Sequence, residues 1–129
     1  MKTVVLVFVL MANTLFAQET NKDENTRYIL IEAPCKPGFK AKNDFKENVI
    51  LTKIFKKEFE NAFELVNAEP ELIIAFEVAL EEAYPNSRNQ IKDILVYMIN
   101  SEKDAKALYK RKLKQFEALN TGIIELKIK

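Results

Sequence analysis

The sequence predicts an α+β domain that is predominantly helical, in which three or four helices separate a short N-terminal strand from a short C-terminal strand that pairs with it. Residues 27–33, RYILIEA, are rich in β-branched and aromatic side chains and stop at Pro34, which is typical of a strand. Residues 123–129, IIELKIK, alternate apolar and polar side chains, as a strand with one solvated face does. Between them, apolar residues recur mostly three or four positions apart, which predicts helices.

Residues 1–17 are expected to be a secretory signal peptide. Lys2 precedes an apolar run that starts at Val4, and the segment ends at the small residue Ala17, where cleavage is expected. A membrane-spanning helix needs about 20 apolar residues, and this run is interrupted by Asn13. We therefore expect an exported, periplasmic or extracellular protein, with no membrane contact after the signal is removed.

The rest of the chain is expected to form a disordered leader and one domain. Residues 18–26, QETNKDENT, have no apolar member and cannot repay the entropy of ordering. Residues 27–129 match the commonest domain size and are expected to form a single helical domain. The whole chain has 20 basic and 19 acidic residues, so loss of Lys2 with the signal leaves no net charge to attract nucleic acid.

Three helical segments are expected between the strands. A capping-box pattern opens the first, at residues 44–67, and a proline that suits a first helical turn opens the second, at residues 70–84. Residues 88–119 form either one long helix or two that meet at Asn100 and Ser101, and a single broken helix is favoured. The NTG sequence at 120–122 ends it. Two lone strands leave backbone groups unpaired, so they are expected to pair with each other, and the alternative is that they add to a sheet in another chain.

The composition excludes most catalytic chemistry. The chain contains no histidine, one cysteine and two distant glycines, so it lacks the usual general base, a zinc-ligand set and a phosphate-binding loop. No enzymatic activity, metal or cofactor is expected. Glu77 and Glu81 stand one helical turn apart and could serve as a hydrolase pair, but they are expected to belong to a solvated helix face.

Cys35 is a candidate reactive thiol. Two flanking prolines would hold it rigidly, and Lys36 would favour a thiolate. The competing interpretations, which are favoured, are a small buried hydrophobic residue or a partner in an intermolecular disulfide.

Two predicted helices carry opposite charge. Residues 69–84 contain five glutamates and no basic residue, whereas residues 103–114 contain six basic residues and one aspartate. The favoured interpretation is that the two helices are neighbours in a bundle and attract each other. The alternative is an interaction surface formed by Lys106, Lys110, Arg111, Lys114, Glu77 and Glu81.

Three classes of function remain open. The leading one is an exported, non-enzymatic protein-interaction module, which binds another protein or a second copy through a strand edge or its charged helix faces. The first alternative is a carrier of an apolar small molecule in a bundle cavity. That cavity would be lined by Phe45, Phe55, Phe59, Phe63, Phe76 and Phe116. The second alternative is a carboxylate-dependent hydrolase.

Overall fold

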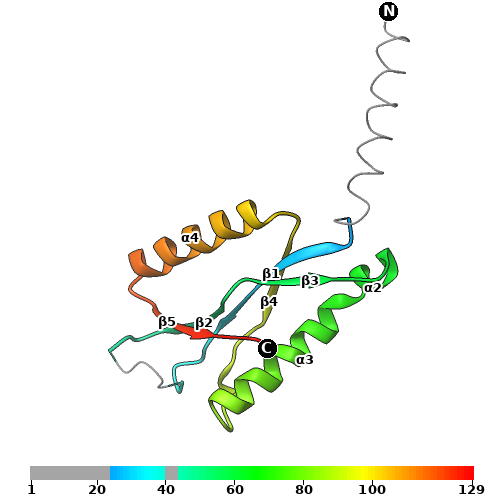
Figure 1. Cartoon of the computed structure of the whole chain (residues 1–129). Coiled ribbons are helices and arrows are strands. Elements are labelled where there is room, and N and C mark those ends of the chain that lie inside the picture. The colour runs from blue at the N-terminus through cyan, green and yellow to red at the C-terminus, as the bar shows by residue number, and fades with distance from the viewer. Residues whose placement is uncertain (1–23, 40–43) are drawn as a thin grey trace, which may run out of the picture.

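The computed structural model describes residues 24–39 and 44–129, and in them a five-stranded sheet lies between two layers of helices (Figure 1). This is a mixed α/β fold. The expected predominantly helical fold with only two strands is therefore wrong. The predicted signal peptide, residues 1–17, lies outside the described residues, as does the predicted leader up to residue 23.

The central strand is β1 (Thr26–Pro34), which pairs with three others. β2 (Asn48–Thr52) and β3 (Phe55–Glu58) follow each other along one of its edges, and β4 (Leu95–Ile99) covers the other edge; all three are antiparallel to β1. β5 (Gly122–Leu126) pairs in parallel with β2. The two predicted terminal strands exist as β1 and β5, but the prediction that they pair is wrong, because β2 lies between them.

A β-bulge separates β2 from β3. Their registers with β1 place Lys53 and Ile54 opposite the single residue Leu30. At the bulge, the side chain of Thr52 takes the place of a backbone acceptor. Its Oγ1 accepts a hydrogen bond from the backbone N–H of Ile31 at 2.9 Å. Beyond β2, residues 127–129 have no strand neighbour among the described residues.

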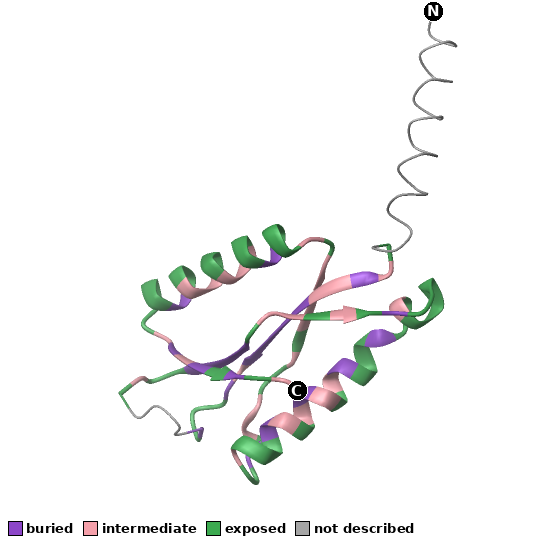
Figure 2. Ribbon diagram, viewed as in Figure 1, coloured by how far each residue is buried: buried purple, intermediate pink, exposed green. Residues whose placement is uncertain are grey.

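The helices cover both faces of the sheet. α2 (Ala62–Val66) and α3 (Ala68–Ala83) lie on one face, and α4 (Glu102–Ala118) lies on the other (Figure 1). A 3-10 turn, η1 (Arg88–Gln90), connects α3 to β4. Buried residues concentrate in β1, in β2 and on the sheet-facing sides of the helices (Figure 2).

Side chains of β1 point alternately to the two faces of the sheet, so this strand contributes buried residues to both faces. Ile29 and Ile31 are fully buried on the α3 side, where they belong to one cluster with Phe76. Glu32 points to the opposite side, where its carboxylate meets Lys112 of α4. The cluster on the α3 side consists of Ile29, Ile31, Ala33, Cys35, Phe39, Ile50, Phe59, Ala68, Leu72, Phe76, Leu80, Ile124 and Leu126.

The predicted helix at residues 44–67 is wrong over most of its length. Residues 48–52, NVILT, are all buried in β2, as is usual for an unbroken apolar run in an interior strand. The helical spacing that suggested otherwise included Phe63 and Val66, which are 77% and 78% exposed. Only the short α2 is helical in this region.

The helix predicted at residues 88–119 is confirmed only in its C-terminal part, as α4. The Ser101 hydroxyl accepts from the backbone N–H of Asp104 at 3.1 Å and so caps α4. The residues before this cap form β4, whose sequence LVYMI is rich in strand-favouring side chains. The second predicted helix, residues 70–84, is confirmed as α3 with slightly earlier bounds.

α4 ends in a Schellman motif at the predicted stop. Asn120 is left-handed, with φ 55°, and its N–H donates to the carbonyl of Glu117 at 3.1 Å. The N–H of Thr121 donates to the carbonyl of Phe116 at 2.9 Å. This turn directs the chain from α4 into β5.

Candidate functional site

The outer edge of β5 exposes backbone hydrogen-bonding groups. The N–H of Gly122 donates to the carbonyl of Glu47 at 2.9 Å, and the carbonyl of Leu126 accepts from the N–H of Lys53 at 3.1 Å. Alternate residues of a parallel ladder face the same neighbour, so the N–H and C=O groups of Ile123 and Glu125 point away from β2. Among the described residues, β5 has no strand on that side.

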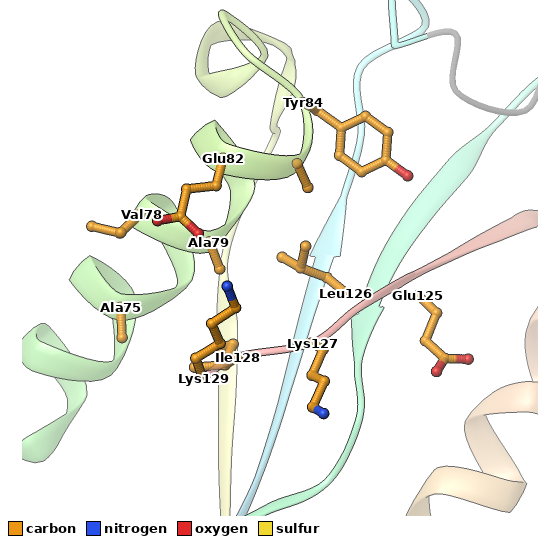
Figure 3. Close-up of a pocket in the computed structure, with 11 residues that line it drawn as sticks. Ala75, Val78, Ala79, Glu82, Tyr84, Glu125, Leu126, Lys127, Ile128 and Lys129 are labelled. Carbon is orange, nitrogen blue, oxygen red and sulfur yellow. The ribbon is translucent and has the colours of Figure 1, made fainter.

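A groove runs between this edge and α3 (Figure 3). Its volume is about 560 Å³. Three alanines one turn apart, Ala75, Ala79 and Ala83, line the α3 side, and Leu126 and Ile128 line the opposite side. Because the alanines have only methyl side chains, α3 leaves space next to the chain end. The remaining lining residues are Val78, Glu82, Tyr84, Glu125, Lys127 and Lys129.

A smaller hollow of about 260 Å³ lies on the α4 side of the same strand. It is lined by Lys53, Ile54, Tyr109 and Glu125, and the Lys53 Nζ lies 3.1 Å from the Glu125 Oε1. Burial raises the pKa of Tyr109, the charge of Glu125 adds to this effect, and Lys53 opposes it. The side chains of an added strand point alternately to the two faces of a sheet, so both hollows are available to them.

Glu77 and Glu81 do lie together in a third hollow, of about 400 Å³. Glu77 forms an ion pair with Arg88, and the carboxylate of Glu81 accepts from the backbone N–H of Asn86 at 3.1 Å. Both carboxylates therefore interact with the segment that follows α3 and stabilise its position. In the described part of the chain, no three histidine, cysteine or acidic side chains are grouped to hold a metal ion.

The four basic residues of the candidate interaction surface lie together on the outer face of α4. Lys106, Lys110, Arg111 and Lys114 are exposed, and the Nζ of Lys106 lies 3.0 Å from the carboxylate of Glu102 on the same helix. The acidic pair on α3 lies on the other side of the sheet (Figure 1). The interpretation that the charged helices are neighbours attracting each other is therefore wrong, because the sheet separates them.

A buried ion pair beneath α4 was missed from the sequence. The Nζ of Lys112 lies 2.9 Å from the Oε1 of Glu32, and the two side chains are 16% and 9% exposed. The hydroxyl of Tyr97 donates to the same Oε1 at 3.4 Å. Burial acts to lower the pKa of Lys112, but hydrogen bonds and charge from Glu32 and Tyr97 outweigh it, so the pKa is raised. The helical phase of Lys112, one turn before the buried Phe116, could have indicated this position.

Cys35 is a core residue. Its side chain belongs to the cluster on the α3 side, and its Sγ–H donates to the carbonyl of Ala33 at 3.6 Å. Burial raises the pKa of the thiol to about 11, despite opposing effects of the Ile50 backbone and the Lys92 charge. At neutral pH this environment favours the thiol over the nucleophilic thiolate.

The phenylalanines do not gather around one hollow. Phe76 is buried on the α3 side and Phe116 is buried on α4, whereas Phe63 is exposed to solvent. The three hollows described above contain no phenylalanine. The geometry thus gives no support to a phenylalanine-lined carrier cavity.

Comparisons with known proteins return no match: no family model, no curated sequence and no solved structure is significantly similar to this chain. Within residues 24–39 and 44–129, no helix has the length and apolar character needed to cross a membrane.

Proposed function

We propose that this protein is an exported, non-enzymatic interaction module that binds an extended segment of a partner by strand addition to β5. The observation that carries the proposal is the coincidence of two features in one place. The outward backbone groups of Ile123 and Glu125 lie at an edge without a described strand neighbour, and a groove of about 560 Å³ follows that edge beneath α3.

Strand addition uses both features. Backbone hydrogen bonds to the free edge supply affinity that does not depend on sequence, and hollows for alternate side chains supply specificity. The groove offers Leu126 and Ile128 on one wall and the alanines of α3 on the other, so it favours small or medium apolar side chains. We therefore expect a partner segment with apolar residues at alternate positions and no proline within it.

Export is supported by the sequence alone. The basic start, apolar run and small residue of residues 1–17 have the layout of a signal peptide. A module of this kind acts outside the cytoplasm, where its partner must also be found.

A non-enzymatic role is supported by the residues present. Histidine is absent from the chain, and burial raises the pKa of the Cys35 thiol. Glu77 and Glu81 bind Arg88 and the backbone N–H of Asn86. None of these groups is arranged as a nucleophile with an adjacent base.

A phage-displayed library of random dodecapeptides tests the proposal. Selected peptides are expected to alternate apolar side chains and to bind the purified protein with measurable affinity by calorimetry. Lys127→Pro should abolish binding, because it removes an outward N–H beyond the β2 ladder, whereas Lys127→Ala should retain binding. Val78→Asp, in the groove, should weaken binding, and the matched variant Ile74→Asp, outside it, should not.

Selected peptides that bind equally well to Lys127→Pro and Val78→Asp would show that another surface is used. Failure to select any peptide would also count against the proposal. Both Val78 and Ile74 are more than half exposed, so the two variants should fold, and circular dichroism verifies this.

A further inference from the structure

We propose that the strand that docks on this edge is β5 of a second copy, in a two-fold antiparallel pairing centred on Leu126. This inference rests on the proposed function, because it names the partner of the same edge. It would give one continuous sheet that crosses the dimer interface, with an isologous and closed contact.

Backbone geometry restricts the possible registers. Outward groups belong to the odd-numbered residues of β5, so an odd-numbered residue must face an odd-numbered residue of the second copy. A two-fold axis can then pass through any residue of the strand, and the side chains decide among these positions.

Charge selects the register. An axis through Glu125 would place two glutamates opposite each other, and an axis through Lys127 would do the same with two lysines; like charges directly opposite are destabilising. An axis through Leu126 instead places Glu125 opposite Lys127 of the second copy, and the symmetry repeats that pair. An axis through Ile124 would face Ile123 with Glu125 and would leave the chain end unpaired.

The apolar face agrees with this register. With the axis at Leu126, Ile124 lies opposite Ile128 of the second copy, and the two Leu126 side chains face each other. In one copy Ile124 and Leu126 already belong to the core on the α3 side, with Ile128 packed against it. The second copy would continue that core and occupy the space left by Ala75 and Ala79.

Residues 127–129 lengthen the strand that is available for this pairing. β2 ends at Thr52, and residues 127–129 extend beyond it without a described strand neighbour. Pairing of residues 123–129 with their symmetry mates gives these backbone groups a partner. A five-residue strand alone would offer a much shorter ladder.

Charge-swapped variants test the register by sedimentation velocity of the purified protein over a concentration series. Glu125→Lys places lysine opposite lysine twice, and Lys127→Glu places glutamate opposite glutamate twice. Each variant should raise the dimer dissociation constant by roughly tenfold to hundredfold. The double variant restores both opposite-charge pairs and should dimerise as the unmodified chain does. A mixture of the two single variants should form a heterodimer.

Two control variants separate the effect of the charge swaps on dimerisation from other effects of changing these side chains. Glu125 also pairs with Lys53 in its own chain, and Lys53 lines the smaller hollow, so Lys53→Ala measures how loss of that pair alone changes the dimer dissociation constant. It should weaken the dimer far less than either charge swap. Lys110→Glu changes a basic residue on the outer face of α4 and should have no effect on dimerisation.

The remaining outcomes overturn the inference in distinguishable ways. A protein that stays monomeric at all concentrations, but binds a library peptide in a manner that Lys127→Pro abolishes, would refute the second copy and leave the proposed function standing. A dimer that tolerates both single swaps would refute this register. A dimer lost in Lys110→Glu would indicate head-to-tail contact between the charged helix faces instead.

Discussion

The Nζ of Lys112 lies 2.9 Å from the Oε1 of Glu32, and both side chains are largely withdrawn from water between α4 and the sheet. The same Nζ lies 5.1 Å from the centre of the Tyr97 ring. This contact joins α4 to β1 and β4.

Loss of one partner from this pair should be costly. Lys112→Met leaves the Glu32 carboxylate buried without a neighbouring cation, and we expect the free energy of unfolding to fall by about 3 kcal/mol. The double variant Glu32→Gln with Lys112→Met should lose less than the single variant. Urea denaturation measures both, with the exposed Lys110→Met as a control expected to change stability by less than about 0.5 kcal/mol.

The contribution of Lys112 should vanish at alkaline pH. Its pKa is higher in the folded protein than the ordinary value of 10.5, so the stabilisation is present below that value and is lost as the pH rises through the folded pKa. The stability difference between the unmodified chain and Lys112→Met should therefore be constant from neutral pH to about pH 9 and should shrink above about pH 10.5. A difference that grows with alkaline pH would contradict the assignment.

Cys35 should react slowly in the folded protein. With a pKa of about 11, only about one thiol in a thousand is ionised at pH 8, and the side chain is buried. An aromatic disulfide reagent should label the native protein at least about a hundredfold more slowly than the urea-unfolded protein. Rapid stoichiometric labelling of the native state would restore Cys35 as a reactive-thiol candidate.

The turn into β5 should tolerate glycine but not alanine. Asn120 has φ 55°, where an alanine Cβ is strained and glycine is not. Asn120→Ala is expected to cost about 1 kcal/mol of unfolding free energy, and Asn120→Gly to cost nothing measurable. Thermal or urea unfolding of the two variants, compared with the unmodified chain, provides the test.

Elements with a strong local signal were predictable. β1 and β5 were recognisable from their composition and alternation, α3 from its apolar periodicity, and the C-terminal end of α4 from the Asn120 stop. A helix that starts after Ser101 was only the less favoured of two alternatives. These features depend on residues within a few positions of one another, which is the range over which capping and periodicity act.

The three strands that lie between β1 and β5 in the sequence were not predictable in the same way. β2 is buried on both faces, so its run NVILT does not alternate and can be read as part of a helix face. β4 lies next to a true helix, and its apolar residues continued the phase of that helix. Only pairing with β1, which is distant in sequence, distinguishes these segments as strands.

The sequence indicated the type of candidate site, a strand edge, but not its position in the fold. A free strand edge was expected to bind, and that expectation remains a prediction. The groove is formed by alanines of α3 and by the residues after β5. These segments are distant in the sequence, and only the fold brings them together. The sequence places residues of opposite charge on α3 and α4, but the sheet separates the two helices.

Amide hydrogen exchange of β5, resolved by NMR, is the sharpest test of strand addition at this edge. In dilute protein the amides of Ile124 and Leu126 should be protected by β2, while those of Ile123, Glu125 and Lys127 should exchange rapidly. Raising the concentration, or saturating with a selected peptide, should protect the three odd-numbered amides. Protection of those amides in a dilute sample that sedimentation shows to be monomeric would show that the chain itself covers this edge, and indifference to saturating peptide would show that nothing docks there.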